Sequence, residues 1–96
     1  MNNEQPEGIL ETLEEKKTSV DLPFKVILYN DNVHSFDEVI AQLIKALGCS
    51  FTKARSLAYE AHVKGKSTIF FGDLTACLKV SSILEEIALH TQILSE

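Results

Sequence analysis

Residues 26–38 read VILYNDNVHSFDE and combine a strand signal, a turn signal and the start of a helix. The first four residues are bulky and apolar, which predicts a buried strand. The Asn-Asp-Asn run at residues 30–32 is typical of a turn, because short polar side chains hydrogen-bond the local backbone. Ser35 and Glu38 form an S-x-x-E capping box, which predicts a helix directly after the turn. The polar turn is therefore expected between two rigid elements, where its side chains can meet a ligand.

The rest of the chain shows the same alternation of apolar periodicity and turn residues. Small side chains recur on one face of the second predicted helix, which must therefore approach its neighbour closely. The order predicts an α+β fold, a small βααβαβ sandwich in which one three-stranded sheet packs against helices. The predicted strands are 24–30, 67–71 and an edge strand within 92–95; the predicted helices are 36–47, 53–64 capped by Thr52, and 74 to about 89.

The charge is unevenly distributed along the 96 residues. Six of the 14 acidic residues, but only two lysines, lie in residues 1–22, whereas the rest of the chain is nearly neutral. We expect residues 1–22 to form a flexible acidic arm and residues 23–96 to form one small domain. The absence of a basic face argues against nucleic acid or an anionic membrane as a partner. The apolar runs are too short to span a bilayer, so we expect a cytoplasmic protein.

The side chains that most often carry chemistry do not form a catalytic or metal-binding pattern. Cys49 and Cys77 stand alone, and neither the cysteines nor the three histidines have the spacing of zinc ligands. The sequence also lacks a glycine-flanked nucleophile and a phosphate-binding glycine loop. We therefore expect no metal, no cofactor and no enzymatic activity. His62 and Asp31 could form an acid–base pair, but the sequence supplies no nucleophile, metal site or cofactor site to accompany it.

Two motifs together resemble the ClpS family. Residues 25–31 read KVILYND and residues 61–66 read AHVKGK. The family pattern is K-V-(I/L)-L-x-N-D-D-x-T-P-M-E-F-V, followed by V-H-x-x-G-(K/R), and the resemblance covers about residues 23–90. ClpS proteins are adaptors. They bind proteins whose first residue is Leu, Phe, Tyr or Trp and deliver them to a Clp AAA+ unfoldase and protease.

The resemblance implies that Asn30, Asp31 and His62 hold the α-amino group of the substrate. An ammonium group has three donors and a positive charge, so it suits a carboxylate and two neutral acceptors. Protonation of His62 would remove one acceptor, so binding is expected to weaken in acid. Taken singly, Asn30 and Asp31 also fit a simple turn, and His62 also fits a histidine at a helix C-terminus.

The resemblance also implies an apolar pocket for the first side chain of the substrate. By position the pocket is built from Leu28, Phe36, Ala58 and Ala61. The family usually has Met at the position of Phe36, and larger residues are common at the two alanine positions. The alanines enlarge the pocket, while Phe36 narrows or fills it. The sequence is compatible both with a pocket that favours aromatic first residues and with a closed pocket.

The third predicted helix departs from the family pattern A-E-x-x-E-x-K, which docks on the N-terminal domain of a ClpA- or ClpC-like unfoldase. Thr75 and Leu78 replace the two acids, and Lys79 is displaced by one place. Thr75 and Lys79 are the candidate docking residues, and the arm of residues 1–22 is the candidate delivery segment. The alternative function is a protein–protein interaction module that kept the ClpS fold and lost or changed its ligand specificity.

Overall fold

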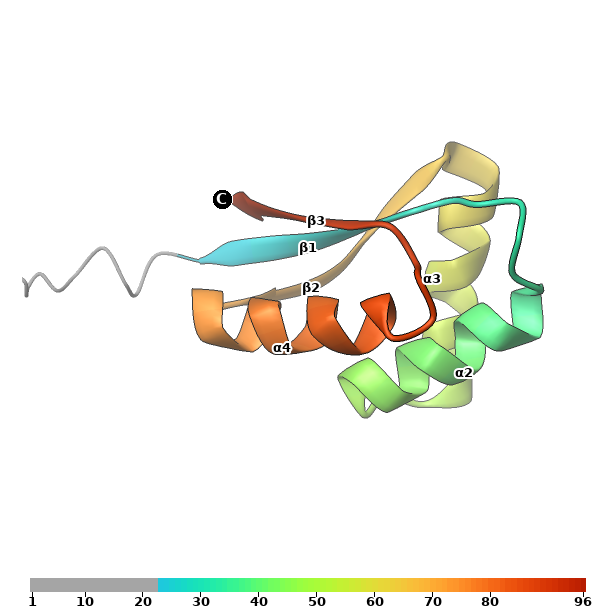
Figure 1. Cartoon of the computed structure of the whole chain (residues 1–96), viewed down its shortest axis with the longest axis horizontal. Helices are drawn as coiled ribbons and strands as arrows, with labels where there is room; N and C mark the ends of the chain where they lie inside the picture. Colours follow the sequence, from blue (N-terminus) through green and yellow to red (C-terminus); the bar gives the residue numbers. More distant parts are fainter. Residues whose placement is uncertain (1–22) are drawn as a thin grey trace, which may run out of the picture.

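The computed structural model describes residues 23–96, which form a three-stranded sheet and three helices (Figure 1). The α+β fold class and the βααβαβ order predicted above are confirmed. The predicted acidic arm, residues 1–22, lies outside the described residues. The elements are β1 (Phe24–Tyr29), α2 (Phe36–Leu47), α3 (Phe51–Lys64), β2 (Lys66–Gly72), α4 (Leu74–Glu85) and β3 (Thr91–Ser95).

The sheet is antiparallel with the order β2-β1-β3, so β1 lies in the centre and β3 at an edge. Leu28 of β1 pairs with Ser67 of β2 and with Thr91 of β3. In Figure 1, α4 runs along one face of the sheet, and α2 and α3 lie toward the end at which β1 leads into α2. The loop after β1 therefore lies near α2 and α3.

The core lies between the sheet and the helices. Val26 and Leu28 alternate along β1 and belong to the core, and Ile27 between them, on the other face of the strand, is also buried. The small residues predicted for the inner face of α3 are buried there, with Ala54, Ala58 and Ala61 each at most 3% exposed. The small side chains of α3 therefore leave room for close packing and, at the end near β1, for a cavity.

The start of α3 differs from the prediction. Ser50, not Thr52, caps the helix: the Ser50 Oγ accepts the backbone N–H of Lys53 at 3.1 Å. Both residues are good caps by type, and they lie only two positions apart. Ser50 has the extended backbone that a cap requires, with φ −71° and ψ 161°, which places Thr52 inside the first turn.

The end of α4 also differs from the prediction, because the helix ends at Glu85 rather than near Leu89. The backbone turns at Ala88, whose φ is 63°, and the N–H groups of Ile87 and Leu89 both donate to the carbonyl of Leu84. The apolar pattern continues past the helix because Ile87 and Leu89 still pack on the core. The apolar periodicity of this segment therefore predicted burial correctly, but it predicted too long a helix.

Candidate functional site

The loop after β1 is fixed against the end of α3. The backbone N–H of Asn30 donates to the carbonyl of Gly65 at 3.0 Å. Gly65 ends α3 with a left-handed backbone, φ 90°, and it lies three residues after His62. The Tyr29 N–H donates to the carbonyl of His90 at 3.0 Å, which fixes the other side of the strand. These bonds bring the Asn30 turn and the His62 end of α3 to one site.

The site contains a cavity of about 510 Å³. All seven residues that the sequence analysis assigned to substrate binding line this single cavity. Its polar part comes from Asn30, Asp31 and His62, and its apolar part from Leu28, Phe36, Ala58 and Ala61. The remaining lining residues are Tyr29, Asn32, His34, Val39, Arg55, Tyr59 and Leu89.

Phe36 leaves the cavity open. It is the first residue of α2, and its side chain contributes to the lining while the residue stays 37% exposed. Ala58 and Ala61 form a buried part of the lining, each at 3% exposure. The geometry therefore combines a polar turn, an apolar wall of small side chains and an aromatic ring that is partly in solvent.

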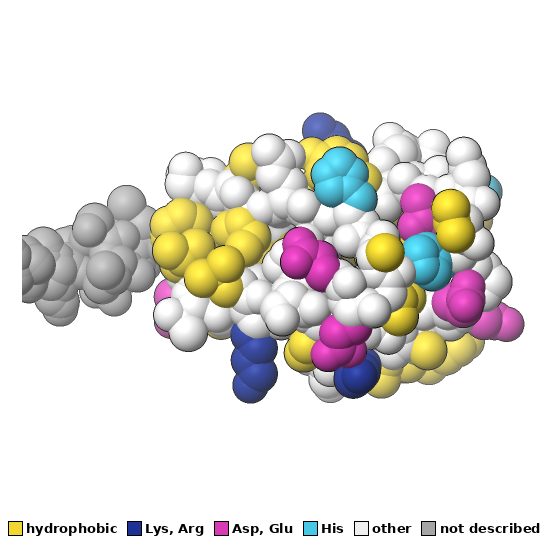
Figure 2. All heavy atoms as spheres, in the orientation of Figure 1, with side chains coloured by type: hydrophobic (Ala, Val, Ile, Leu, Met, Phe, Trp, Pro, Cys, Tyr) yellow, Lys and Arg dark blue, Asp and Glu magenta, His cyan; other side chains and the backbone are white. Residues whose placement is uncertain are grey.

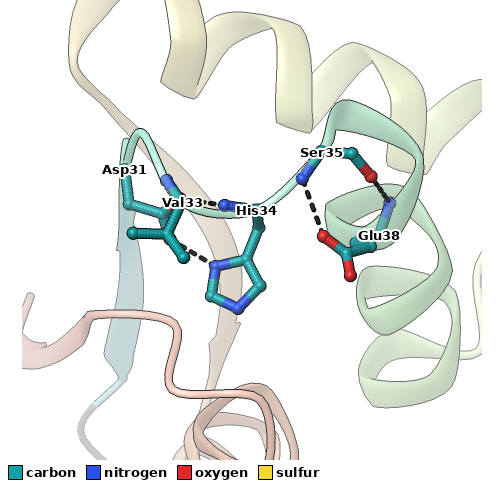
Figure 3. A network of polar contacts seen from close by, with 5 residues as sticks. All are labelled: Asp31, Val33, His34, Ser35 and Glu38. Atoms are coloured by element: carbon teal, nitrogen blue, oxygen red, sulfur yellow. Dashed lines mark hydrogen bonds and ion pairs between the residues drawn. The ribbon is translucent and has the colours of Figure 1, made fainter.

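The Asp31 carboxylate makes three hydrogen bonds within its own turn (Figure 3). Its Oδ1 accepts the backbone N–H of Val33 at 3.1 Å and that of His34 at 3.0 Å. Its Oδ2 lies 2.9 Å from Nδ1 of His34, with the two side chains 21% and 14% exposed. The adjacent Ser35–Glu38 capping box, also drawn in Figure 3, confirms the predicted helix start. The turn thus holds the carboxylate in one orientation.

The pair of Asp31 and His34 favours its charged forms. Burial acts to raise the pKa of Asp31, but hydrogen bonds from His34 and Val33 outweigh it and lower that pKa below its ordinary value. The hydrogen bond to Asp31 raises the pKa of His34 against the effect of burial, helped by the backbone of Ile87 and the charge of Glu38. The ion pair therefore forms above the lowered pKa of Asp31 and is lost as the pH rises through the raised pKa of His34.

Five residues of the cavity with charged or hydrogen-bonding side chains were not predicted from the sequence: Tyr29, Asn32, His34, Arg55 and Tyr59. Arg55 and Tyr59 precede His62 by seven and three residues, and with Ala58 they form a stripe at helical spacing. The helical repeat that leads back from His62 along α3 is therefore the signal that indicates Arg55 and Tyr59. Leu89 carries no such signal, because the turn after α4 brings it to the cavity.

Thr75 and Lys79, the candidate docking residues, lie elsewhere. Both are exposed on α4 and do not line the cavity. Two leucines on the same helix are also exposed, Leu74 at 44% and Leu78 at 53%. Figure 2 shows hydrophobic side chains gathered over the end of the molecule where α4 begins. The exposed surface of α4 is therefore more apolar than that of a helix with the acidic family pattern.

The two cysteines of the chain do not line the cavity. Cys49 is half-buried and Cys77 is buried, and neither forms a disulfide. Within residues 23–96, no three His, Cys, Asp or Glu side chains are grouped so that they could hold a metal ion. None of the helices there is both long and apolar enough to cross a membrane.

Comparisons with known proteins agree with this fold. The solved structure of Agrobacterium tumefaciens ClpS2 bound to L-phenylalaninamide superimposes with a TM-score of 0.72 at 20% identity, covering 79% of this chain and 99% of that one. Human E3 ubiquitin-protein ligase UBR2 is 31% identical over 58 residues, 60% of this chain, and mouse UBR2 is 29% identical over 82 residues, 85% of this chain. The matches span only 3% and 4% of the length of these ligases.

A sequence model of one family matches nearly all of the described residues. The family is described as ATP-dependent Clp protease adaptor protein ClpS, and the match covers residues 19–93. It includes both motifs quoted above, from the strand that leads into the Asn30 turn to the glycine that ends α3. The chain therefore belongs to the ClpS family.

Proposed function

We propose that this protein is an adaptor that binds the first residue of N-degron proteins and delivers them to a Clp AAA+ unfoldase and protease. The observation that carries the proposal is the cavity, in which a polar turn and an apolar wall lie side by side. L-phenylalaninamide, with which the Agrobacterium ClpS2 structure was solved, has a free α-amino group and an aromatic side chain. The cavity of this chain offers complementary groups for both parts.

The polar side of the cavity suits an ammonium group. A carboxylate can accept about four hydrogen bonds, and Asp31 already accepts three of them from its turn. One acceptor site therefore remains for a charge-assisted bond to the substrate. The side-chain oxygen of Asn30 and an unprotonated ring nitrogen of His62 would accept the other two N–H groups. The α-amino group would thus be recognised by its charge and by all three of its donors.

The apolar side suits the first side chain of the substrate. Leu28, Ala58 and Ala61 are almost completely buried where they meet the cavity, so they present carbon atoms without competing polar groups. Phe36 lies at the edge and can cover an inserted ring from the solvent side. Burial of apolar area supplies affinity, while the polar turn supplies selectivity for a chain terminus.

The decisive test is anisotropy binding of a labelled peptide that begins with Phe, compared with the same peptide acetylated at its N-terminus. Acetylation removes the charge and two of the three donors, so we expect affinity to fall at least about tenfold. Equal affinity of the two peptides would contradict recognition of the α-amino group. Failure to bind peptides that begin with Phe, Leu, Tyr or Trp would contradict the proposed function as a whole.

We expect His34 to make this binding pH-dependent. Because its pKa is raised, His34 takes up a proton at a higher pH than an ordinary imidazole, and as an imidazolium it neutralises Asp31 and repels the incoming ammonium. Affinity for the Phe peptide should fall about fivefold between pH 8 and pH 6. In a His34→Asn variant, the amide can still donate to Asp31 but carries no charge, so the fall should be smaller.

The matched control for this titration is His90→Asn. His90 stacks on Tyr29, with ring centroids 4.7 Å apart, and does not line the cavity. This variant should keep the pH profile of the wild type. If His34→Asn also keeps it, the pair of Asp31 and His34 does not control binding.

Delivery requires a second surface, and α4 is the candidate. Thr75 and Lys79 are exposed there and would contact the N-terminal domain of a ClpA- or ClpC-like unfoldase. The exposed Leu74 and Leu78 favour the second candidate function, an interaction module of ClpS fold with a different partner. The peptide experiment separates the two functions, since only the adaptor requires binding through a free N-terminus.

A further inference from the structure

Arg55 lines the cavity, but it belongs neither to the polar side that would bind the α-amino group nor to the apolar wall described above. It is the only arginine of the chain and is exposed on α3. Tyr59, one helical turn further on, lines the same cavity at 57% exposure. The two side chains therefore form a cationic and hydroxyl-bearing rim beside the proposed ligand site.

The carboxylates on neighbouring elements have other partners. Asp31 bonds within its turn, Glu38 accepts the N–H of its capping box at 2.8 Å, and Glu60 accepts the Ser67 hydroxyl at 2.9 Å. Within residues 23–96, Arg55 makes neither an ion pair nor a side-chain hydrogen bond. Its guanidinium group is a strong donor with five N–H groups and is available to a ligand in the cavity.

The spacing of Arg55 and His62 indicates which part of a ligand reaches the guanidinium. Seven residues of α-helix advance about 10 Å, and each residue of an extended peptide advances about 3.4 Å. A peptide whose amino group is bound near His62 can therefore bring its second or third residue close to Arg55. Asn32, which also lines the cavity, is neutral, so it adds no negative charge that would repel an acidic residue there.

We propose that Arg55 selects substrates with an acidic side chain at the second or third position, directly after the bulky first residue. This inference rests on the proposed function and deepens it, because it defines the substrate class beyond the first residue. The planar guanidinium pairs with a carboxylate through two parallel hydrogen bonds. Tyr59 flanks the pair and can donate a further hydrogen bond from its hydroxyl.

The test compares labelled peptides that begin Phe-Asp or Phe-Ala-Asp with the isosteric peptides that begin Phe-Asn or Phe-Ala-Asn. We expect one of the acidic peptides to bind about two- to fivefold more tightly than its amide counterpart, as is typical of an exposed ion pair. The preference should shrink in high salt because the pair is screened. Equal affinity within both peptide pairs would overturn the inference.

The residue responsible is identified by two variants of the same helix. Arg55→Gln should abolish the preference, whereas Lys53→Gln should keep it, because Lys53 is exposed on α3 but does not line the cavity. A preference that survives in Arg55→Gln would overturn the assignment to Arg55.

A competition experiment with L-phenylalanine and L-phenylalaninamide tests whether Arg55 instead binds the α-carboxylate of a free amino acid. If L-phenylalanine competes better than the amide and Arg55→Gln removes that advantage, Arg55 binds the carboxylate of the first residue and the inference fails.

The same peptides separate the failure of this inference from the failure of the proposed function. If the Phe-Asn peptide binds and loses affinity on acetylation, while the acidic peptides bind no better, only the role of Arg55 is wrong. If none of the peptides binds the wild-type protein, the proposed function fails and the inference fails with it.

Discussion

Replacing Asp31 by Asn is expected to weaken binding of a Phe peptide with a free N-terminus by about 10- to 100-fold, the usual range for losing a hydrogen bond to a charged group. The substitution removes the negative charge but keeps an oxygen that can accept the backbone N–H groups of Val33 and His34. The turn should therefore persist while the charge-assisted bond to the ammonium is lost. Anisotropy titration of the labelled peptide measures the change.

The control is Asp37→Asn. Asp37 is exposed in the first turn of α2 and does not line the cavity, so its removal changes the net charge by the same amount without touching the site. We expect its affinity to stay within about twofold of the wild type, because exposed charges at this distance are screened. Wild-type affinity in Asp31→Asn would show that the carboxylate does not bind the α-amino group.

Truncating Leu84 to Ala is expected to lower the free energy of unfolding by about 2–5 kcal/mol, the range found for buried leucines. Leu84 is 0% exposed and lies in the main core cluster between α4 and the sheet. Its removal leaves a cavity that the surrounding elements cannot fill completely. Urea unfolding followed by far-ultraviolet circular dichroism measures the loss as a lower transition midpoint.

The same substitution at Leu78 provides the comparison. Leu78 lies on the same helix but is 53% exposed, so Leu78→Ala should change the free energy of unfolding by about 0.5 kcal/mol or less. If the two variants lose equal stability, α4 does not pack on the sheet through Leu84. If neither loses stability, the core does not depend on this helix.

The capping box of Ser35 and Glu38, a signal that acts within one helical turn, was predicted correctly. The structure has further local caps: Asp73 caps α4, and Gly48 and Gly65 end α2 and α3 with positive φ. Each of these features depends on a hydrogen bond or a backbone angle between residues at most four positions apart. The local sequence therefore contains all that they require.

Two kinds of feature were predicted less well: those for which two neighbouring residues are equally suitable, and those that depend on packing between residues far apart in the sequence. Ser50 and Thr52 are both suitable caps by type, and the extended backbone at Ser50 makes Ser50 the cap. The end of α4 followed from the turn at Ala88, which brings Leu89 to the cavity. Neither outcome has a distinct local pattern, because Thr52 is an equally suitable cap by type and the apolar periodicity continues past the end of α4.

The sequence by itself determined the order of the elements, the alanine face of α3 and the family of the chain, because these depend on periodicity and short motifs. Only the tertiary structure decided that the cavity is open beside Phe36, that His34 pairs with Asp31, and that Arg55 reaches the same site. These features arise where β1, α2, α3 and the turn before β3 meet. The volume and the charge of the site depend on how closely the elements approach, which no single segment encodes.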